Sequence, residues 1–305
     1  MHRARSTAAA LLAAFALAGC SAMRAAPAPS TSSPPAATPT ATAGVPDLDH
    51  VVVIVLENKP SKRVLGAAEA PYLNRLAARG ALATRYSAIR HPSLPNYLAM
   101  TSGTTGGLTR DCAPAECGVA VTTIASEVAA SGRTWRMYAE SMPAPCTRTN
   151  AGDYAVRHNP FLYDPSVTGD AAGCAQHDVP YDRLAADLAG GRLPDLAFIS
   201  PNLCDDMHDC GVATGDAWMA REVPKILASS AFRSGRSLLV VTFDEGVSAD
   251  NTVATVLAGP AARPGARSGR PYTHYSLLRT IEDAWHLAPL AKGDRAAAPM
   301  TDLLR

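Results

Sequence analysis

The stretch HVVVIVLEN, residues 50–58, decides the fold class, because a run of β-branched and aliphatic residues ends there in a carboxylate and an amide. A continuous apolar run of this length is typical of a central strand that is covered on both faces. A second run, SLLVVTFDE at residues 237–245, ends in the same way. We therefore expect two buried strands whose carboxyl ends carry Glu57-Asn58 and Asp244-Glu245.

Further strands and helices are expected to alternate on both sides of these two runs. The expected strands cover residues 81–89, 134–138, 195–200 and 252–257, and the expected helices begin near residues 71, 96, 122, 181, 216 and 275. This alternation predicts the α/β class, as a three-layer sandwich with a largely parallel central sheet. Ligands of such sheets bind beyond the carboxyl ends of the strands, where the two polar pairs fall.

Composition narrows the function classes. The chain has 305 residues, 47% of them hydrophobic and 18% charged, which fits one large domain with an ample core. A formal net charge of +1 provides no global basic field, and only 6% of the residues are aromatic. Both values argue against nucleic acid as a partner. No obligatory protein partner is evident in the sequence.

The N-terminus is typical of an exported protein. Arg3 and Arg5 precede an apolar stretch at residues 8–18 that is too short to span a bilayer. The following LAGC resembles the bacterial lipoprotein signal, in which Cys20 is lipidated and anchors the protein to the membrane. An ordinary signal peptide, cut nearby with loss of Cys20, is the alternative. The expected location is the cell surface, as a lipoprotein, or the exterior, as a secreted protein.

Residues 21–46 consist mostly of Ala, Pro, Ser and Thr, with almost no large apolar side chain. Such a segment buries too little surface to offset its ordering entropy, so a flexible tether is expected. The predicted organisation is a signal peptide at 1–20, a tether at 21–46 and the folded, catalytic domain at 47–305.

The cysteine count also favours export. Of seven cysteines, six remain when Cys20 is set aside, and an even number suits an oxidising compartment. Sequence proximity favours the pairs Cys112–Cys117 and Cys204–Cys210, which leaves Cys146–Cys174. A structural zinc site is the rival interpretation, but the chain contains no CxxC pair.

The two strand-end pairs are the first candidates for chemistry. Adjacent carboxylate and amide oxygens are hard ligands that suit a divalent cation. Two neighbouring carboxylates beside a buried strand are costly unless a positive charge compensates them. We therefore expect a shared metal ion, although a pair of solvated strand ends is the alternative. Oxygen ligands favour Mg²⁺, Ca²⁺ or Mn²⁺, and nearby histidines leave Zn²⁺ open.

A serine and three histidines are the other candidates. Ser93, in HPSLPN, precedes an expected helix, whose N-terminus favours a bound anion such as phosphate. A simple N-cap serine explains the same pattern. His208 lies among aspartates, including Asp206, that are able to orient it for acid catalysis. His158 and His274 are isolated, and isolated histidines more often have a surface or supporting role.

These clusters, in this order, resemble the phosphoesterase family that includes secreted bacterial acid phosphatases and phospholipases C. The catalytic domain of that family is similar to alkaline phosphatase. The matching stretches run from about residue 50 to 303: VVVIVLENK, APYLNRLAARGAL, HPSLPNYLAMTSG, YAVRHNPF, ISPNLCDDMHDC, TGDAWM, LLVVTFDEG and HYSLLRTIEDAW. The closest likeness is to short secreted acid phosphatases of actinobacterial type.

The resemblance implies a role for each matched residue. One divalent metal ion is expected, held by Glu57, Asn58, Asp244 and Glu245. Ser93 is implied as the metal-bound nucleophile, and His158 and His208 as phosphate-pocket residues, one of which protonates the leaving group. Three more residues of the matching stretches are expected at the substrate: Asn96, Asp206 and His274. The expected function is an exported, metal-dependent phosphomonoesterase with a phosphoserine intermediate and an acidic optimum.

Other functions remain open at this point. A phosphodiesterase of phospholipase C type uses the same parts, but larger members of the family often have arginine where this chain has Tyr97. A sulfatase is disfavoured, because the Cys/Ser-x-Pro-x-Arg signature is absent around Ser93. A non-catalytic lipoprotein that binds an anion or a partner is the alternative from another class. A periplasmic-type small-molecule binder is disfavoured, because no second lobe of comparable size is evident in the sequence.

Overall fold

The computed structural model describes residues 44–305. The expected signal peptide, Cys20 and nearly all of the expected tether lie outside the described residues. Within the described part, no helix is both long enough and apolar enough to cross a membrane.

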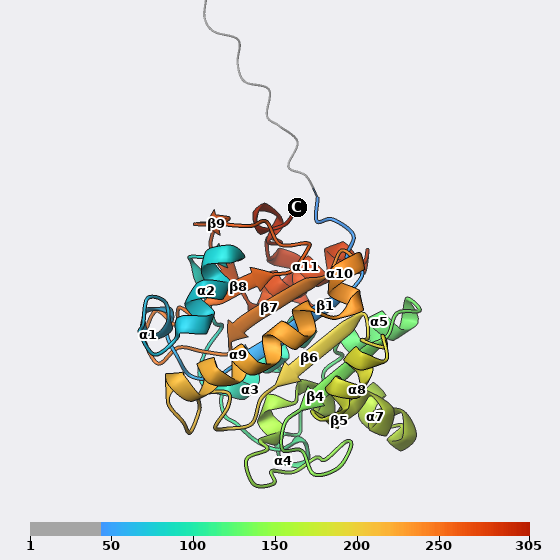
Figure 1. The fold of residues 1–305 in the computed structure, drawn as a ribbon. Coiled ribbons are helices and arrows are strands. Elements are labelled where there is room, and N and C mark those ends of the chain that lie inside the picture. Colours follow the sequence, from blue (N-terminus) through green and yellow to red (C-terminus); the bar gives the residue numbers. More distant parts are fainter. Residues whose placement is uncertain (1–43) are drawn as a thin grey trace, which may run out of the picture. The chain divides into compact units, whose positions relative to one another are not determined.

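An eight-stranded sheet forms the middle layer of the domain (Figure 1). Its strands are β1 (Val51–Leu56), β2 (Ala81–Ala83), β4 (Trp135–Ala139), β5 (Asp178–Pro180), β6 (Leu196–Ser200), β7 (Leu238–Phe243), β8 (Thr255–Ala258) and β9 (Arg267–Ser268). In space they follow the order β5-β4-β6-β1-β7-β8-β2-β9. All neighbours are parallel except β8, which is antiparallel to both β7 and β2. The predicted, largely parallel sheet is therefore confirmed.

β1 lies at the centre of this sheet, and its sequence explains why. All six residues are fully buried, as expected for β-branched and aliphatic side chains covered by helices on both faces. β1 pairs with β6 on one side and β7 on the other, and Leu56 lies opposite Phe243. Because the strands are parallel and in this register, the residues that follow them, Glu57 and Asp244, emerge next to each other.

Helices cover both faces of the sheet (Figure 1). α2 (Pro71–Arg79) and α9 (Val212–Leu227) pack against each other on the face that is nearer in this view. α3 (Ser93–Ser102) and α11 (His274–Ala284) pack together behind the sheet. The shorter helices are α1 (Ser61–Val64), α4 (Pro114–Cys117), α5 (Ile124–Ala130), α6 (Pro165–Thr168), α7 (Ala171–His177), α8 (Arg183–Ala189), α10 (Ser230–Ser234) and α12 (Lys292–Ala296). The expected three-layer sandwich is thus observed.

Four expected boundaries were wrong by three residues or more, and two of these are simple shifts: α9 begins at Val212 rather than near 216, and β8 begins at Thr255 rather than 252. Residues 81–89 do not form one strand, because the chain leaves the main sheet after β2 and continues as β3 (Tyr86–Ser87). β3 pairs instead with β10 (Tyr272–Thr273) in a separate two-stranded sheet. α3 begins at Ser93, three residues before Asn96, since a proline such as Pro95 is tolerated in the first turn of a helix.

The three disulfides join the predicted pairs, Cys112–Cys117, Cys146–Cys174 and Cys204–Cys210. They account for every cysteine in residues 44–305, so no thiolate of the described domain is free for a structural zinc site.

Candidate active site

Three carboxylates meet at the carboxyl ends of three adjacent strands. Glu57 follows β1, Asp244 follows β7, and Asp206 lies in the loop after β6. The Glu57 amide donates to the carbonyl of Asp206 at 2.8 Å, and the Asp244 amide donates to the carbonyl of Leu56 at 2.9 Å. All three side chains have 0% exposure. The sheet edge at which ligands of this fold class bind therefore carries a concentrated, buried negative charge.

Ser93 faces this cluster from the first residue of α3. Its hydroxyl donates to Oε2 of Glu57 at 3.1 Å, and the residue is only 3% exposed. Asn96 holds the loop that leads to Ser93. Its side-chain oxygen accepts from the amides of Ile89 and Arg90, and its side-chain nitrogen donates to the carbonyls of Arg90 and Pro92. Both polar atoms of the Asn96 side chain are thus hydrogen-bonded to the backbone of the loop.

Tyr97 is a site residue that the sequence analysis missed. Its hydroxyl donates to Oε1 of Glu57 at 2.6 Å, so a hydroxyl contacts each oxygen of that carboxylate. Its ring stacks on His158, with 5.1 Å between the centroids and 9° between the planes. The signal was available, because Tyr97 follows Ser93 by four residues and lies on the same face of the helix.

His158 joins two of the carboxylates. Its Nε2 lies 3.4 Å from Oε1 of Glu57, and its Nδ1 lies 3.4 Å from Oδ2 of Asp206. Glu57, His158 and Asp206 offer ligand atoms that all lie within 4.8 Å of one another, and all three residues are buried. This spacing is suited to a metal ion. Burial and the nearby positive charge of Arg157 hold the pKa of His158 well below its ordinary value.

His208 lies at the rim, in the loop closed by the Cys204–Cys210 disulfide. Its backbone amide donates to Oδ1 of Asp206 at 2.7 Å, and its Nδ1 lies 2.6 Å from Oδ1 of Asp209. Its Nε2 lies 3.2 Å from a guanidinium nitrogen of Arg157. With 31% of its side chain exposed, His208 has access to solvent that His158 lacks.

Arg157 and Asp111 extend the rim, and neither was predicted. The Asp111 carboxylate accepts from the amide of Leu94 at 2.9 Å, in the first turn of α3, and lies 3.6 Å from Nε of Arg157. These contacts join loops that are far apart in the sequence, so no local pattern indicated them.

Asn58 supports the two strand ends. Its φ of 55° lies in the left-handed region, which asparagine tolerates better than most residues. This conformation directs the backbone amide of Asn58 to Oδ1 of Asp244 at 3.0 Å, while its side-chain nitrogen donates to Oε2 of Glu57 at 3.2 Å. Asn58 therefore connects the ends of β1 and β7.

Glu245 and His274 are placed differently from the other predicted residues. The carboxylate of Glu245 contacts Nδ1 of His91 at 2.5 Å, which gives it a partner outside the central cluster. His274 is fully buried, with Nε2 at 2.5 Å from the carbonyl of Asp244 and Nδ1 at 3.2 Å from the hydroxyl of Tyr86. Both ring nitrogens of His274 are engaged, and burial lowers its pKa to about 4.

The electrostatics of the carboxylate cluster favour the binding of a cation. Burial raises the pKa of Asp206 to about 7 and that of Asp244 to about 8, and it raises the pKa of Glu57 well above its ordinary value with help from Asp244 and Asp206. Among the described residues, no lysine or arginine forms an ion pair with any of the three. Lys59 instead donates to the carbonyl of Met207 at 2.7 Å.

Three buried atoms of the cluster have no hydrogen-bond partner: Nε2 of His158, Oδ2 of Asp206 and Oδ2 of Asp244. Buried polar atoms are rarely left unpaired, and here they are oxygen and imidazole donors of the kinds that bind divalent metals. The residues present therefore fit a divalent cation.

Buried carboxylates lie at the carboxyl edge of a parallel sheet with a serine at a helix N-terminus beside them, an arrangement suited to hydrolysis of an anionic ester. Residues 63–288 match the model of the phosphoesterase family. The phosphatidylinositol-3-phosphatase of Mycobacterium tuberculosis is 36% identical over 265 residues, which cover 86% of this chain and 85% of that protein. The chain belongs to the phosphoesterase family, and it is a phosphoric ester hydrolase.

Fungal relatives are also similar. An acid phosphatase of Aspergillus fumigatus is 32% identical over 73% of this chain, and a phosphate-repressible acid phosphatase of Penicillium chrysogenum is 34% identical over 82% of it. The match spans 52% and 62% of these two proteins, so both are longer than the region they share with this chain.

Solved structures establish the fold. A protein of the alkaline phosphatase superfamily from Vibrio parahaemolyticus has a TM-score of 0.60 at 12% identity, covering 84% of this chain and 72% of that one. Murine ectonucleotide pyrophosphatase / phosphodiesterase 5 also has a TM-score of 0.60, at 10% identity, over 84% of this chain and 100% of that one. The predicted alkaline phosphatase-like fold is confirmed.

Proposed function

We propose that this protein is an exported, metal-dependent phosphomonoesterase of acid phosphatase type that acts through a phosphoserine intermediate at Ser93. The observation that carries the proposal is the contact between the Ser93 hydroxyl and a fully buried carboxylate, Glu57, at 3.1 Å. A serine hydroxyl is a weak nucleophile unless a base or a metal activates it, and here a carboxylate is adjacent among residues that would hold a metal. Relatives named as phosphatases support the same reaction class.

The metal-binding residues we propose are Glu57, Asn58 and Asp244, with the hydroxyl of Ser93 beside them. His158 and Asp206 flank Glu57 on its other side and complete a second possible donor set. Glu245, which the sequence placed among the ligands, is assigned instead to the wall of the site, where it holds His91. A bound Mg²⁺, Ca²⁺, Mn²⁺ or Zn²⁺ would stabilise an ionised serine and the charge on the phosphate oxygens.

In the first step, the Ser93 oxygen attacks phosphorus and its proton leaves toward Oε2 of Glu57, the acceptor of its hydrogen bond. The bond between phosphorus and the ester oxygen breaks, and the departing alcohol takes a proton from His208. Water then attacks the phosphoserine and gives a proton to His208. The serine–phosphorus bond breaks, Ser93 takes back the proton that Glu57 received in the first step, and phosphate is released.

His208 is better placed than His158 to exchange a proton with the leaving group and with water. Burial lowers the pKa of His158, which disfavours its charged form, whereas His208 is partly exposed and its Nδ1 lies 2.6 Å from Oδ1 of Asp209. The acidic pH optimum of activity that we expect from the sequence therefore depends on His208. Asp206 acts as a positioning residue, because it accepts from the backbone of His208 and contacts the ring of His158.

Asn96 and His274 are likewise proposed as positioning residues rather than substrate contacts, which revises the expectation from the sequence. The Asn96 amide holds the loop before Ser93, and His274 supports the backbone of Asp244 from behind. Neither side chain has a polar atom left for a substrate.

A monoester is favoured over a diester as the substrate. The relative that covers most of both chains is named as a phosphatase of a phosphorylated lipid, phosphatidylinositol 3-phosphate, so a phosphoinositide monoester belongs in the first substrate panel. The phospholipase C type of diesterase remains the second candidate, because it needs the same nucleophile and metal.

The decisive experiment is a panel of phosphate monoesters and a phosphocholine diester, measured from pH 4 to pH 9 with and without a chelator. We expect monoester turnover that is highest at acidic pH and that the chelator abolishes. Faster turnover of the diester would overturn the monoesterase assignment, and full activity of the chelated enzyme would overturn the metal.

Export is supported by the three disulfides, which form and persist in oxidising compartments. The lipid anchor proposed at Cys20 is tested by cell fractionation. The wild-type protein should sediment with membranes, and a Cys20→Ala variant should appear in the soluble or secreted fraction. Identical distributions would exclude the anchor.

A further inference from the structure

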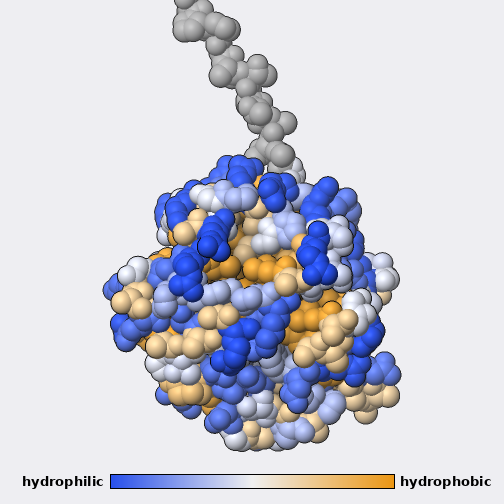
Figure 2. Space-filling model, viewed as in Figure 1, coloured by the Kyte–Doolittle hydropathy of each residue, from blue (hydrophilic) through white to orange (hydrophobic). Residues whose placement is uncertain are grey.

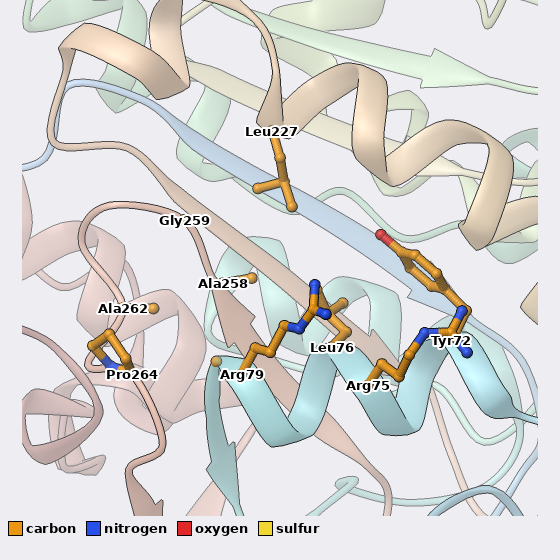
Figure 3. A pocket seen from close by; sticks show the side chains of 10 residues that line it. Tyr72, Arg75, Leu76, Arg79, Leu227, Ala258, Gly259, Ala262 and Pro264 are labelled. Atoms are coloured by element: carbon orange, nitrogen blue, oxygen red, sulfur yellow. The ribbon is translucent and has the colours of Figure 1, made fainter.

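A cavity bordered by two arginines lies away from the edge of the sheet that carries Glu57 and Asp244. It has a volume of about 220 Å³ and is formed by one face of α2, the end of β8 and Leu227 at the end of α9 (Figure 3). Because β8 is antiparallel to β7, its last residue, Ala258, lies opposite Leu239 near the beginning of β7. Asp244 follows the other end of β7, so the sheet separates this cavity from the active site.

Two arginines border the cavity on the side of α2. Arg75 and Arg79 are one helical turn apart, both exposed, and both extend from the same face of the helix (Figure 3). Among the described residues, neither has a carboxylate partner. Like charges at this spacing repel each other, so the pair costs the helix some stability. No acidic side chain lines the cavity to offset them.

An aromatic ring adds to this cationic side. The guanidinium of Arg75 lies 5.7 Å from the ring centroid of Tyr72, close enough for a cation–π contact that restrains its position. Tyr72 therefore keeps one of the two guanidinium groups near the cavity before any ligand arrives.

The remaining walls are apolar. Leu76, Ala258 and Ala262 form a buried floor, and Leu227 and Pro264 complete the lining. Figure 2, viewed as Figure 1, shows apolar surface in a hollow between α2 and the end of α9, bordered by hydrophilic side chains. The cavity thus combines a positive side with a hydrophobic side.

We propose that this cavity binds a small organic phosphate, with the phosphate between Arg75 and Arg79 and an apolar body of ring size against Leu76, Leu227 and Pro264. Guanidinium groups bind the oxygens of phosphate with paired hydrogen bonds. A phosphate offers more acceptor oxygens and more charge than a carboxylate, so it satisfies two guanidinium groups at once. The volume lies below that of typical drug-sized pockets, which limits the ligand to a small body.

The test uses phenylphosphonate, which contains no ester bond for the enzyme to cleave, and follows backbone amides of the full-length protein by ¹H–¹⁵N NMR. We expect saturable shifts of the amides in residues 72–80 and 258–264, separate from any shifts near Glu57. The Arg75→Gln/Arg79→Gln variant should lose the first set and retain the second. A matched double variant at exposed arginines elsewhere, Arg192→Gln/Arg295→Gln, should retain both.

Two comparisons make the result decisive. Inorganic phosphate should bind the cavity at least several-fold more weakly than phenylphosphonate, since it leaves the apolar walls uncovered. Shifts that survive in Arg75→Gln/Arg79→Gln, or an absence of shifts in the wild-type protein, would overturn the proposal, as would equal affinity for inorganic phosphate. The single variant Arg79→Gln gives the same test if the double variant does not fold.

Discussion

The hydroxyl of Ser93 lies 3.1 Å from Oε2 of Glu57, and the hydroxyl of Tyr97 lies 2.6 Å from the other oxygen of the same carboxylate. One helix therefore supplies both hydroxyl groups that contact Glu57, from residues one turn apart. This arrangement fixes the direction in which the proposed nucleophile approaches the site, and it underlies the first two predictions.

Replacing Ser93 with alanine should lower kcat by roughly 10³-fold or more, because the covalent route is lost. Ser93→Thr, which keeps a hydroxyl, should retain far more activity. Acid-quenched wild-type enzyme should carry a phosphoryl group on the peptide that contains Ser93, detectable by mass spectrometry. An alanine variant within tenfold of wild type, with a normal circular dichroism spectrum, would show that another group attacks phosphorus.

Replacing Tyr97 with phenylalanine keeps the ring that stacks on His158 but removes the hydrogen bond to Glu57. We expect kcat/KM to fall by roughly tenfold, since a buried carboxylate loses a donor that orients it. The matched control is Tyr163→Phe, which removes a buried hydroxyl that bonds to the carbonyl of Cys112. Equal effects of the two substitutions on activity would reduce Tyr97 to a packing role.

The carboxylate cluster predicts that activity depends on a divalent cation, and single substitutions identify the residues that bind it. Glu57→Gln should weaken cation binding most, because Glu57 belongs to both proposed sets of metal ligands. Asp244→Asn removes a ligand of the first set and Asp206→Asn a ligand of the second, so the larger effect shows which set binds the cation. The control is Asp178→Asn, at a buried aspartate that contacts Asn159 instead. The readouts are the cation concentration that restores activity after chelation and the rise in melting temperature on binding.

In this experiment we expect the apparent Kd to rise by roughly 10- to 100-fold or more in the variants that lose a ligand. A chelated wild-type enzyme whose melting temperature does not respond to any divalent cation would contradict the metal site. An Asp178→Asn effect as large as that of Glu57→Gln would indicate a general loss of stability.

His208→Gln should affect substrates according to their leaving groups. In kcat/KM, which reports formation of the phosphoserine, alkyl phosphates that release a basic alkoxide should lose roughly 10²- to 10⁴-fold, whereas p-nitrophenyl phosphate should lose much less because its leaving group needs no proton. His286→Gln, at a histidine whose side chain is 79% exposed, is the control. A uniform loss across both substrates would assign His208 to binding rather than to acid catalysis.

A buried pair of carboxyl groups far from the active site predicts the pH dependence of stability. Oε1 of Glu282 and Oδ2 of Asp294 both accept from the amide of Leu290, at 3.3 and 2.6 Å, and both residues are fully buried. Burial, with the adjacent Asp294, raises the pKa of Glu282 from 4.5 to about 9. Because the folded-state pKa is the higher one, the stabilisation is complete below pH 4.5 and is lost as the pH rises toward 9.

In that range, the free energy of unfolding should fall by about 1.4 kcal/mol per pH unit for each proton that unfolding releases. Glu282→Gln has no proton to lose at this position. Its free energy of unfolding should therefore fall by about 1.4 kcal/mol less per pH unit than that of the wild type. Denaturant unfolding at a series of pH values measures the two slopes. Parallel curves would contradict the prediction, and Glu69→Gln, at an exposed glutamate, should leave the slope unchanged.

The sequence by itself determined the fold class, the location of the candidate site and the disulfide pairs. The apolar runs before Glu57 and Asp244 identified buried strands, because a short, β-branched run without polar alternation is typical of a strand covered on both faces. Neighbouring parallel strands then bring their carboxyl ends together, which is a consequence of topology. Two of the disulfide pairs followed from short sequence separations, which bring partners close without long-range information, and Cys146–Cys174 was the pair that remained.

Tertiary structure alone decided which way side chains face and which loops meet. Glu245 contacts His91 instead of joining the central carboxylate cluster with Asp244, its neighbour in sequence. Arg157 contacts both His208 and Asp111 from a separate segment of the chain. A local pattern reports whether a residue is buried and in which element. Direction and partner depend on packing between segments distant in the chain, and such contacts leave no periodic trace in the sequence.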